Sequence, residues 1–411
     1  MAVSPQELGR RLREAREACG MTQEQVSLEM GLSRASVAQM ELGNRQVTSL
    51  ELDRLAYLYG RDIRQFLAET FEPQDALTVL LRANPDLTRE GKAAEGLRRC
   101  IALGREISNL EALLGIERDA IAPAAYPTTA LKSKWDAIQQ GARVAMEERR
   151  RINLGDSPLA DITEILDSQG IRIAFVPMPN DVSGMTIHEA GVGIFVAVNA
   201  KHSLLRQRFS FAHEYAHVLL DREFSGSIIS RGDNRAEFIE MRANSFAAVF
   251  LMPDEGVRRY IQSLGKGKPS RSVAEVFDET NVMRVQRRSK PGTQEIRIYD
   301  LVLIAHRFGV STIAALYRIQ NLGLLNNDQA DLLRGEIDRG FDKETAKIMG
   351  LERKAGMLLR LDFKHRFLWL ALEAYRRELI SKAKLHELGK MVDVSLESLL
   401  RLIENHKEDN A

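Results

Sequence analysis

The segment His213-Glu214-Tyr215-Ala216-His217 constrains this chain more than any other part of it. Two histidines four residues apart on a helix project from the same face about one turn from each other, so both imidazoles can reach one metal ion. The glutamate after the first histidine lies beside the same site, where it can accept a proton from water on the metal. The apolar residues between Phe209 and Leu220 predict a buried helix. The alternative interpretation is a core helix whose histidines form only local hydrogen bonds.

A zinc site of this kind needs a third protein ligand and keeps its fourth position for water or substrate. Residues from Glu237 to Pro253 follow helical spacing and predict a second helix that packs against the first. Glu237 and Glu240 lie one turn apart on it, and either could complete a set of two histidines and one glutamate. Spacing does not choose between them. The expected cofactor is Zn²⁺, with Mn²⁺ or Fe²⁺ as alternatives, because imidazole and carboxylate ligands accept all three ions.

The strings RQRFSFAHEYAHVLL and, from Glu240 to Pro253, ExxANxFAAxFLMP resemble the ImmA/IrrE family of metallopeptidases. The resemblance extends upstream to GIFVAVN, Gly193 to Asn199. It implies a zincin-like fold in which Glu240 is the third zinc ligand beside His213 and His217, Glu214 is the general base, and Glu237 is a neighbour. It also implies a protein substrate, because members of this family are best known for cleaving helix-turn-helix repressors.

The first 68 residues predict a unit of five short helices. Thr22 and Ser33 are suited to cap the second and third helices, and Gly31 to terminate the second. The string MTQEQVSLEMGLSRASVAQMELGNR resembles the XRE, or phage-repressor-like, DNA-binding family, whose second motif helix enters the major groove. By that resemblance phosphates are held by Gln23 and by Asn44 or Arg45, and bases are faced by Arg34, Ser36 and Gln39. The expected partner is double-stranded operator DNA.

Charge does not by itself require this partner. Residues 1–68 contain nine basic and nine acidic residues, so the sequence-independent attraction to phosphate is modest unless the charges are segregated onto one face. The alternative interpretation is a unit that dimerises or docks another protein.

Length and composition suggest two to four structural units in 411 residues. Basic residues (58) and acidic residues (57) balance, so no global charge points to nucleic acid or membrane. Cys19 and Cys100 are the two cysteines, and their distance in sequence argues against a disulfide framework or a cysteine metal site. No segment has the length of a membrane span. We therefore expect a cytoplasmic protein with no membrane partner.

The middle of the chain predicts a helical linker over residues 69–132, followed by a metallopeptidase domain over 133–300. An apolar stripe from Leu97 to Leu114 could pair with a second copy of the chain or pack locally, and both interpretations stay open. Ala122 to Thr129, APAAYPTT, reads as a flexible joint. Helices are expected over 134–151 and 161–169, and two or three strands over 171–177, 185–187 and 193–199.

Other features near the predicted sheet carry weaker hypotheses. Ile194 to Asn199 could hold an extended substrate by backbone pairing. His202 could stabilise an oxyanion, although a surface histidine is the simpler interpretation. The basic segments Gly265 to Arg271 and Arg284 to Gln294 read as loops that either touch an acidic partner or are simply solvated.

Residues 301–411 predict a helical C-terminal domain with two segments like a helix-turn-helix, at Leu301 to Leu325 and at Leu379 to Glu404. Within the first of these, the string FGVSTIAALYRIQNLGLL, Phe308 to Leu325, also resembles the segment that follows the metal site in ImmA/IrrE peptidases. Such units would form the floor of the peptidase or a surface that docks substrate. The fold expected for the whole chain is α+β and predominantly helical.

The function that follows is a DNA-binding transcription regulator with zinc-dependent endopeptidase activity. Its expected substrate is a helix-turn-helix repressor, or the protein itself, cleaved to relieve repression in a stress, mobile-element or phage response. One alternative is a transcription factor whose silent peptidase domain senses a metal or ligand. Another is one component of a toxin–antitoxin or phage-defence pair.

Overall fold

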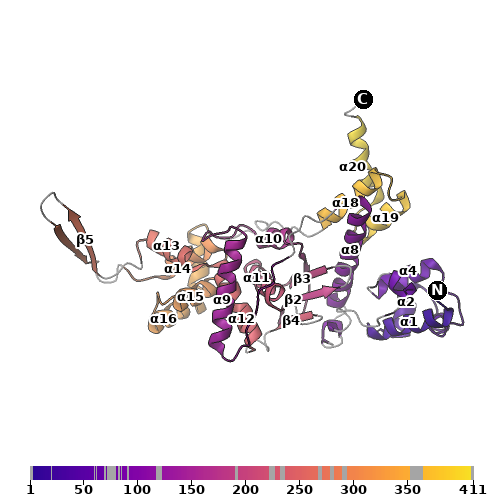
Figure 1. The fold of residues 1–411 in the computed structure, drawn as a ribbon, viewed down its shortest axis with the longest axis horizontal. Helices are drawn as coiled ribbons and strands as arrows, with labels where there is room; N and C mark the ends of the chain where they lie inside the picture. The colour runs from indigo at the N-terminus through magenta and orange to yellow at the C-terminus, as the bar shows by residue number, and fades with distance from the viewer. Residues whose placement is uncertain are drawn as a thin grey trace.

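A computed structural model of the chain shows an elongated arrangement of helices around one small sheet (Figure 1). This is the predominantly helical α+β fold that the sequence predicts. The helix-turn-helix unit lies at one end, and the helix that carries the histidine motif lies near the middle. The structure describes residues 3–19, 21–59, 61, 63–68, 71, 80–81, 84, 86–89, 92–116, 123–189, 193–221, 227–231, 237–266, 271–277, 282–288, 294–351 and 364–408.

The N-terminal unit has the five helices that the sequence predicts: α1 (Pro5–Ala18), α2 (Gln23–Met30), α3 (Arg34–Glu41), α4 (Ser49–Leu58) and α5 (Ile63–Leu67). Thr22 forms a capping box with Gln25, and the Ser33 hydroxyl caps α3. Gly31 has a φ of 65°, a left-handed conformation that lets α2 end in a tight turn before α3. One apolar core, centred on Leu12, Met40 and Tyr59, holds the helices together.

A four-stranded mixed sheet lies at the centre of the chain, in the order β1-β3-β2-β4. β3 runs parallel to β1 and antiparallel to β2, and β4 pairs antiparallel with β2. The strands are β1 (Arg172–Val176), β2 (Val182–Glu189), β3 (Gly193–Asn199) and β4 (Ser227–Arg231). The sequence predicts the first three and misses β4. Because β3 has neighbours on both sides, its backbone cannot pair with a substrate, and the hypothesis that placed substrate along Ile194 to Asn199 is wrong.

Both faces of the sheet are covered, and the alternation of side chains along β3 shows how. Val196 and Val198 belong to the core that contains the histidine helix, whereas Phe195 and Ala197 belong to the core on the opposite face. The helices of the first core include α9 (Lys134–Arg151), α10 (Ile162–Ser168), α11 (Leu204–Leu220), α12 (Phe238–Leu251) and α13 (Asp254–Ser263). The opposite core is closed by α7 (Asp86–Arg89) and the first half of α8 (Lys92–Leu114).

Helices α9 and α12 cross at very close range. A Cβ atom added at Gly141 of α9 would lie 2.2 Å from the carbonyl oxygen of Arg242 in α12. Any larger residue at position 141 would force the two helices apart, so glycine is required for this crossing. The close crossing holds α12 beside α11, where Glu240 must lie to reach the two histidines.

The core around the histidine helix does not end at residue 300, where the sequence suggested a domain boundary. Leu301, Phe308 and Leu316 belong to it, and Arg318 donates a hydrogen bond to the carbonyl of Met252 at 2.9 Å. The helices that follow the predicted boundary are α14 (Ile298–Phe308), α15 (Thr312–Asn321), α16 (Asn327–Asp338) and α17 (Phe341–Ile348). Within the described ranges no single helix has the length and apolar character to cross a membrane, and only α14 and α15, bent by 100°, reach them as a pair.

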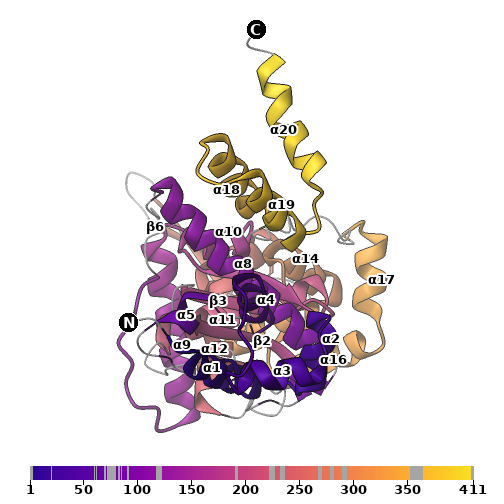
Figure 2. The ribbon, with the colours of Figure 1, turned by 90° about the vertical axis from the view of Figure 1, so that its right-hand side faces the viewer.

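The second half of α8 packs against the last three helices, α18 (Lys364–Arg376), α19 (Lys382–Met391) and α20 (Leu396–Glu408). Ile107 and Leu110 are buried there, while Leu113 stays exposed. The apolar stripe of α8 is therefore covered by the chain itself, which is the local packing that the sequence left open. Figure 2 shows α20 extending away from the rest of the molecule.

The segment read as a flexible joint is anchored. The backbone N–H of Tyr126 donates to the carbonyl of Leu219 at 3.0 Å, and its hydroxyl donates to Glu148 at 2.8 Å. Thr129 accepts two hydrogen bonds from the amide of Gln140. Residues 123–130 thus run along α9 and α11 without secondary structure, and tyrosine anchoring overrides the flexibility that the proline content suggested.

A two-stranded antiparallel hairpin, β5 (Arg271–Phe277) and β6 (Val282–Arg288), projects from the body beyond α13 (Figure 1). The sequence interpretation of Arg284 to Arg288 as loop is wrong, because these residues pair with β5. The valines in both segments favour strand, and the basic residues that alternate with them concealed the pattern. Residues 267–270 and 289–293, also interpreted as basic loop, lie outside the described residues.

A buried carboxylate ties α9 to the histidine helix. Glu148 has no exposed surface and accepts hydrogen bonds from the hydroxyls of Tyr126 and Tyr215 and from the guanidinium of Arg151, the last at 2.6 Å. Burial alone would raise its pKa, but these donors outweigh the effect and hold the pKa of Glu148 below its usual value. The carboxylate is therefore ionised and stabilises the packing of three segments.

We expect Glu148→Gln to lower the free energy of unfolding by about 2 kcal/mol, because it leaves Arg151 and the hydroxyls of buried Tyr215 and half-buried Tyr126 without their ionic acceptor. Chemical denaturation followed by fluorescence measures the change. Glu147→Gln is the matched control, since Glu147 is the neighbouring residue on α9 and forms an exposed pair with Arg143 at 3.0 Å, worth under about 1 kcal/mol. Equal losses in the two variants would contradict a structural role for the buried carboxylate.

Candidate metal centre

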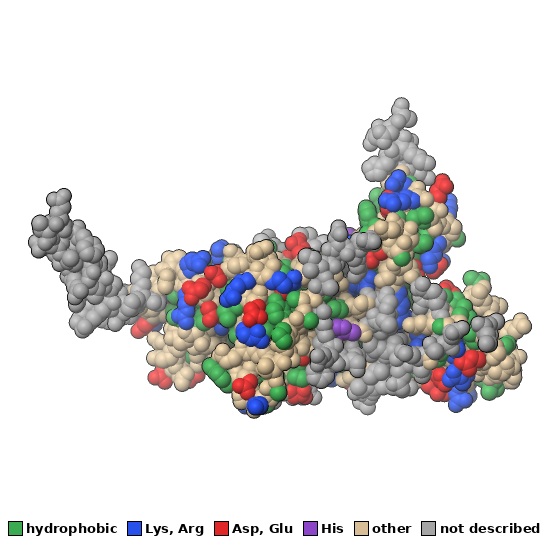
Figure 3. All heavy atoms as spheres, in the orientation of Figure 1, with side chains coloured by type: hydrophobic (Ala, Val, Ile, Leu, Met, Phe, Trp, Pro, Cys, Tyr) green, Lys and Arg blue, Asp and Glu red, His purple; other side chains and the backbone are tan. Residues whose placement is uncertain are grey.

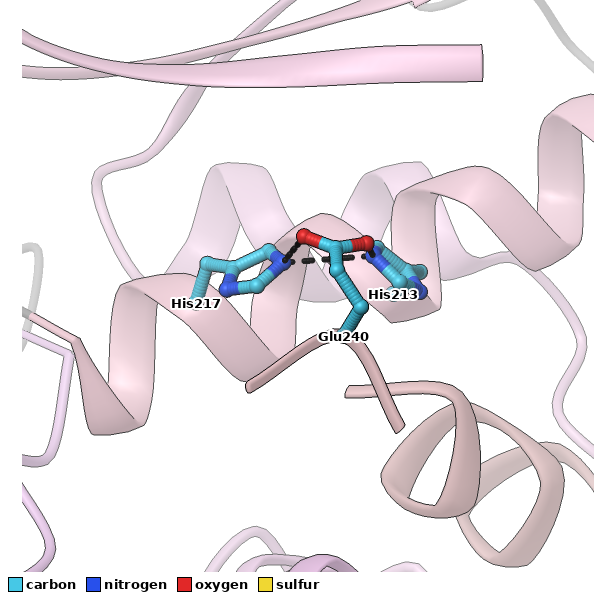
Figure 4. Close-up of side chains that lie close together, drawn as sticks. All are labelled: His213, His217 and Glu240. Carbon is cyan, nitrogen blue, oxygen red and sulfur yellow. Dashed lines mark hydrogen bonds and ion pairs between the residues drawn. The ribbon is translucent and has the colours of Figure 1, made fainter. Parts of the chain in front are cut away.

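Three polar side chains converge in the core between α11 and α12 (Figure 4). His213 and His217 come from successive turns of α11, and Glu240 comes from the first turn of α12. All three are buried. Glu237 is the exposed N-cap residue of α12, so the choice that spacing left open falls on Glu240.

The distances among the three side chains match those of a tetrahedral metal site. His213 Nε2 lies 3.2 Å from His217 Nε2 and 3.1 Å from Glu240 Oε2, and His217 Nε2 lies 3.4 Å from Glu240 Oε1. Ligand atoms at 2.0–2.1 Å from a tetrahedral zinc ion lie about 3.3 Å apart. The donor set of two imidazoles and one carboxylate therefore fits Zn²⁺ in both chemistry and spacing.

Both imidazoles are oriented by the nitrogen that faces away from the centre. His213 Nδ1 donates to Asn244 Oδ1 at 3.0 Å, and His217 Nδ1 donates to Asp221 Oδ2 at 2.9 Å. Asp221 in turn pairs with Arg242. A hydrogen bond at Nδ1 places the proton there and leaves the Nε2 lone pair free for a metal.

The helix that carries the histidines is fixed at its beginning and along its length. The side-chain amide of Gln207 donates to the carbonyls of Ala200 and His202 at 3.1 and 2.8 Å. Arg208 donates to the carbonyl of Leu159 at 2.6 Å, and Tyr215 is held by the buried carboxylate on α9. These contacts set the rotation of α11 about its axis, and so they aim both histidines at α12.

Hydrogen bonds and ion pairs together shift the pKa values of Glu240 and His217 more than burial does. Burial alone would raise the pKa of Glu240, but hydrogen bonds from His213 and His217 lower that pKa to about 2. Burial would likewise lower the pKa of His217, whereas Asp221 and Glu240 raise it to about 10. Without a metal, a proton on His217 neutralises the carboxylates around it, and a metal ion must displace this proton to bind.

Glu214 lies between α11 and the sheet and has no exposed surface. The Thr186 hydroxyl of β2 donates to its Oε2 at 2.8 Å, and a Cβ atom at Gly184 would lie 2.8 Å from its Oε1. Burial raises the pKa of Glu214, and the nearby imidazoles offset part of the shift. The Ser230 hydroxyl of β4 also stabilises the charged form of this carboxylate, while its Oε1 is buried and accepts no hydrogen bond at normal length from a residue that the structure describes.

The centre opens into a cleft of about 610 Å³. Phe209, His213, Glu240 and Asn244 form one side, and Ser230 and Arg231 of β4 line it as well. Another part of its lining comes from α15 and the two residues before it: Val310, Ser311, Ile313, Ala314 and Tyr317. The segment from Leu301 to Leu325 thus contributes to the cleft, as its sequence resemblance implied.

His202, weighed as an oxyanion donor, does not line this cleft. Its Nε2 lies 3.1 Å from the carbonyl oxygen of Asn180, and partial burial lowers its pKa. The structure therefore favours the simpler interpretation of this residue.

The residues expected to contact DNA fall into two groups. Arg34, Gln39 and Asn44 are exposed around α3 and the turn after it, with the Asn44 amide donating to Gln39 at 3.1 Å. The others have protein partners: Gln23 donates to buried Glu41 at 2.9 Å, Arg45 pairs with Glu51 at 2.7 Å, and Ser36 contacts the capping hydroxyl of Ser33. On the face shown in Figure 3, basic and acidic side chains are intermixed.

Sequence reasoning missed the residues that orient the ligands. Asn244 follows Glu240 by four residues and Asp221 follows His217 by four, so both spacings were visible as further helical turns below the ligands. Tyr317 of the cleft wall carried no such signal, because it lies 100 residues beyond His217.

Two histidines and a glutamate around one centre form a group that could hold a metal ion, and a second glutamate lies beside it. Residues 166–288, which contain all four, match a peptidase family model described as the IrrE N-terminal-like domain. Residues 7–66 match a model described as a helix-turn-helix domain. The chain is therefore a fusion of a helix-turn-helix domain with an IrrE-like domain of a peptidase family, as the sequence motifs indicated. No curated protein matches the chain.

We expect Asn244→Ala to weaken zinc binding about 10- to 100-fold, because His213 loses the acceptor that fixes its tautomer and ring orientation. Competition with a chromophoric chelator measures the affinity. The matched control is Ser245→Ala, since the Ser245 hydroxyl donates to the Ile138 carbonyl on α9 and not to a metal ligand. Unchanged zinc affinity in Asn244→Ala would exclude a role for this residue in orienting the ligand.

Proposed function

We propose that the protein is a DNA-binding transcription regulator with zinc-dependent endopeptidase activity. The observation that carries the proposal is the convergence of His213, His217 and Glu240 at tetrahedral spacing, with Glu214 beside them and a cleft in front. The substrate is a helix-turn-helix repressor or another copy of this protein, and cleavage relieves repression in a stress, mobile-element or phage response.

His213, His217 and Glu240 would hold the zinc ion, which when bound activates a water molecule and polarises the carbonyl of the scissile bond. Glu214 accepts the proton of the attacking water on Oε1, while Thr186 holds the other carboxylate oxygen in place. Because burial raises the pKa of Glu214, its protonated form is accessible, and it can pass the proton to the leaving amine.

The substrate would lie along β4 and not along β3. Among the described strands β4 pairs with β2 alone, so β4 is an edge strand of this sheet, the position at which an extended peptide can add to a sheet. Ser230 and Arg231 of this strand line the cleft. Phe209, Ile313 and Ala314 line the same cleft and offer an apolar surface to one substrate side chain.

Glu214→Gln is expected to reduce cleavage by at least about 100-fold, because the amide cannot accept the proton from water. Wild type and variant are each loaded with Zn²⁺ or Mn²⁺ and incubated with candidate substrates. The candidates are helix-turn-helix repressors encoded near the gene and the protein itself, and the products are identified by mass spectrometry. Glu237→Gln is the control, since Glu237 is exposed at the N-cap of α12. Zinc content is measured in all three proteins.

Equal cleavage by wild type and Glu214→Gln would overturn the catalytic assignment. Loss of metal in the variant would show that Glu214 is needed to hold the site together, and the loss of cleavage could then not be assigned to proton transfer. A wild type that holds zinc and changes DNA affinity with it, but cleaves no protein, would support the alternative of a metal-sensing transcription factor.

We also propose that the N-terminal unit reads operator DNA through α3. Its support is the family match and the exposure of Arg34 and Gln39, which suit guanine and adenine edges respectively. Arg34→Ala with Gln39→Ala should weaken specific binding by about 100-fold, since each base contact contributes about 1–3 kcal/mol.

Gel shift with DNA selected from a random pool measures this binding. Arg13→Ala is the control, because Arg13 is an exposed arginine on α1 that pairs with Glu17. Unchanged specific binding in the double variant would show that α3 does not read bases.

A further inference from the structure

One tyrosine, Tyr317, lines the cleft together with two of the metal ligands. α15 begins at Thr312 after Ser311, whose side chain caps it, and Ile313, Ala314 and Tyr317 lie on the face that lines the cleft. His213 and Glu240 line the same cleft of about 610 Å³. A peptide bound at the metal would therefore lie in a cleft that α15 also lines.

The hydroxyl of Tyr317 is held so that its hydrogen is free. Arg334 of α16 donates a hydrogen bond to the Tyr317 oxygen, and its guanidinium carbon lies 5.2 Å from the centre of the Tyr317 ring. A guanidinium group has donors and no acceptor, so the phenol oxygen must be the acceptor of this bond. The phenolic hydrogen then needs another acceptor, and a hydrogen bond received from a cation makes it a stronger donor.

We propose that Tyr317 is a catalytic residue that donates a hydrogen bond to the carbonyl oxygen of the scissile bond as negative charge develops there. This inference rests on the proposed peptidase function. When water attacks the carbonyl carbon, the electron pair of the C=O bond moves onto the oxygen, and the proton of water goes to Glu214. Tyr317 keeps its proton throughout and stabilises the oxyanion together with the metal. Arg334 is a positioning residue that acts through Tyr317.

Other polar groups of the cleft are less suited to this task. Arg231 is paired with Asp86 and Asp181, at 2.8 and 2.9 Å. Arg206 donates to Ser183 at 3.4 Å. The Tyr317 hydroxyl can still donate its hydrogen, because its oxygen is the acceptor of the hydrogen bond from Arg334.

The test compares Tyr317→Phe with wild type and with Tyr299→Phe. Tyr299 is a matched control, because it is also an exposed tyrosine under a cation, with Lys266 Nζ 5.9 Å from its ring centre, and it does not line the cleft. The first readout is the affinity of the zinc-loaded proteins for N-phosphoryl-leucinamide, whose tetrahedral phosphoryl group mimics the oxyanion. We expect binding about 10- to 100-fold weaker in Tyr317→Phe, with zinc affinity unchanged and the control like wild type.

The second readout is cleavage of the repressor identified as substrate. Tyr317→Phe should lower kcat about 100-fold and leave KM within about threefold, because the hydrogen bond forms only in the transition state. Arg334→Met should lower kcat by a smaller factor in the wild-type background and have no further effect in Tyr317→Phe. This non-additivity distinguishes a residue that acts through Tyr317 from one that only stabilises α16.

Unchanged phosphoryl binding and kcat in Tyr317→Phe would overturn the assignment while leaving the peptidase intact. An equal loss in Tyr299→Phe would also overturn it, since the effect would not be specific to the cleft. A zinc-loaded wild type that binds no phosphoryl compound and cleaves no protein would remove the proposed function, and this inference with it.

Discussion

The structure depends on the pairing of one buried carboxylate with two buried imidazoles across two helices. Removing Glu240, His213 and His217 from water is costly unless each finds a partner. They find one another at 3.1 to 3.4 Å, and Asn244 and Asp221 satisfy the outer nitrogens. This pairing tolerates only one rotation of α11 against α12. The close crossing at Gly141 and the buried carboxylate of Glu148 hold the two helices in that rotation.

The sheet positions the carboxylate of Glu214. The alternation along β2 turns Met185 and Ile187 toward the core on the opposite face, so Gly184 and Thr186 face α11. A glycine gives the Glu214 carboxylate room, and a threonine holds one of its oxygens. Glu214, the proposed general base, is therefore positioned by a strand that contributes no residue to the candidate metal site.

Helix α8 connects the parts of the molecule. Its first half closes one face of the sheet, and its second half forms a core with α18, α19 and α20. Arg98 on α8 also donates to the carbonyl of Cys19 at the end of α1, at 3.0 Å. The segment interpreted as a linker is thus a shared structural element of the sheet, the C-terminal helices and the helix-turn-helix unit. The domain limits suggested by the sequence remain predictions. Two buried cores contain residues from both sides of a suggested limit, one at residue 300 and one at residue 132.

The sequence by itself determined the helix-turn-helix unit, the two helices of the metal centre and the strands β1 to β3, because capping residues, helical spacing and β-branched runs are local signals. It also determined three of the groups at the site, His213, Glu214 and His217, since their chemistry follows from positions within one helix. Spacing alone did not choose between Glu237 and Glu240, and the family resemblance implied Glu240, which faces the histidines in the structure. Only the tertiary structure decided that β4 and not β3 is the edge strand beside the cleft, and that Tyr317 lines the same cavity as His213 and Glu240. Each of these depends on how distant segments pack, and packing leaves no local pattern in the chain.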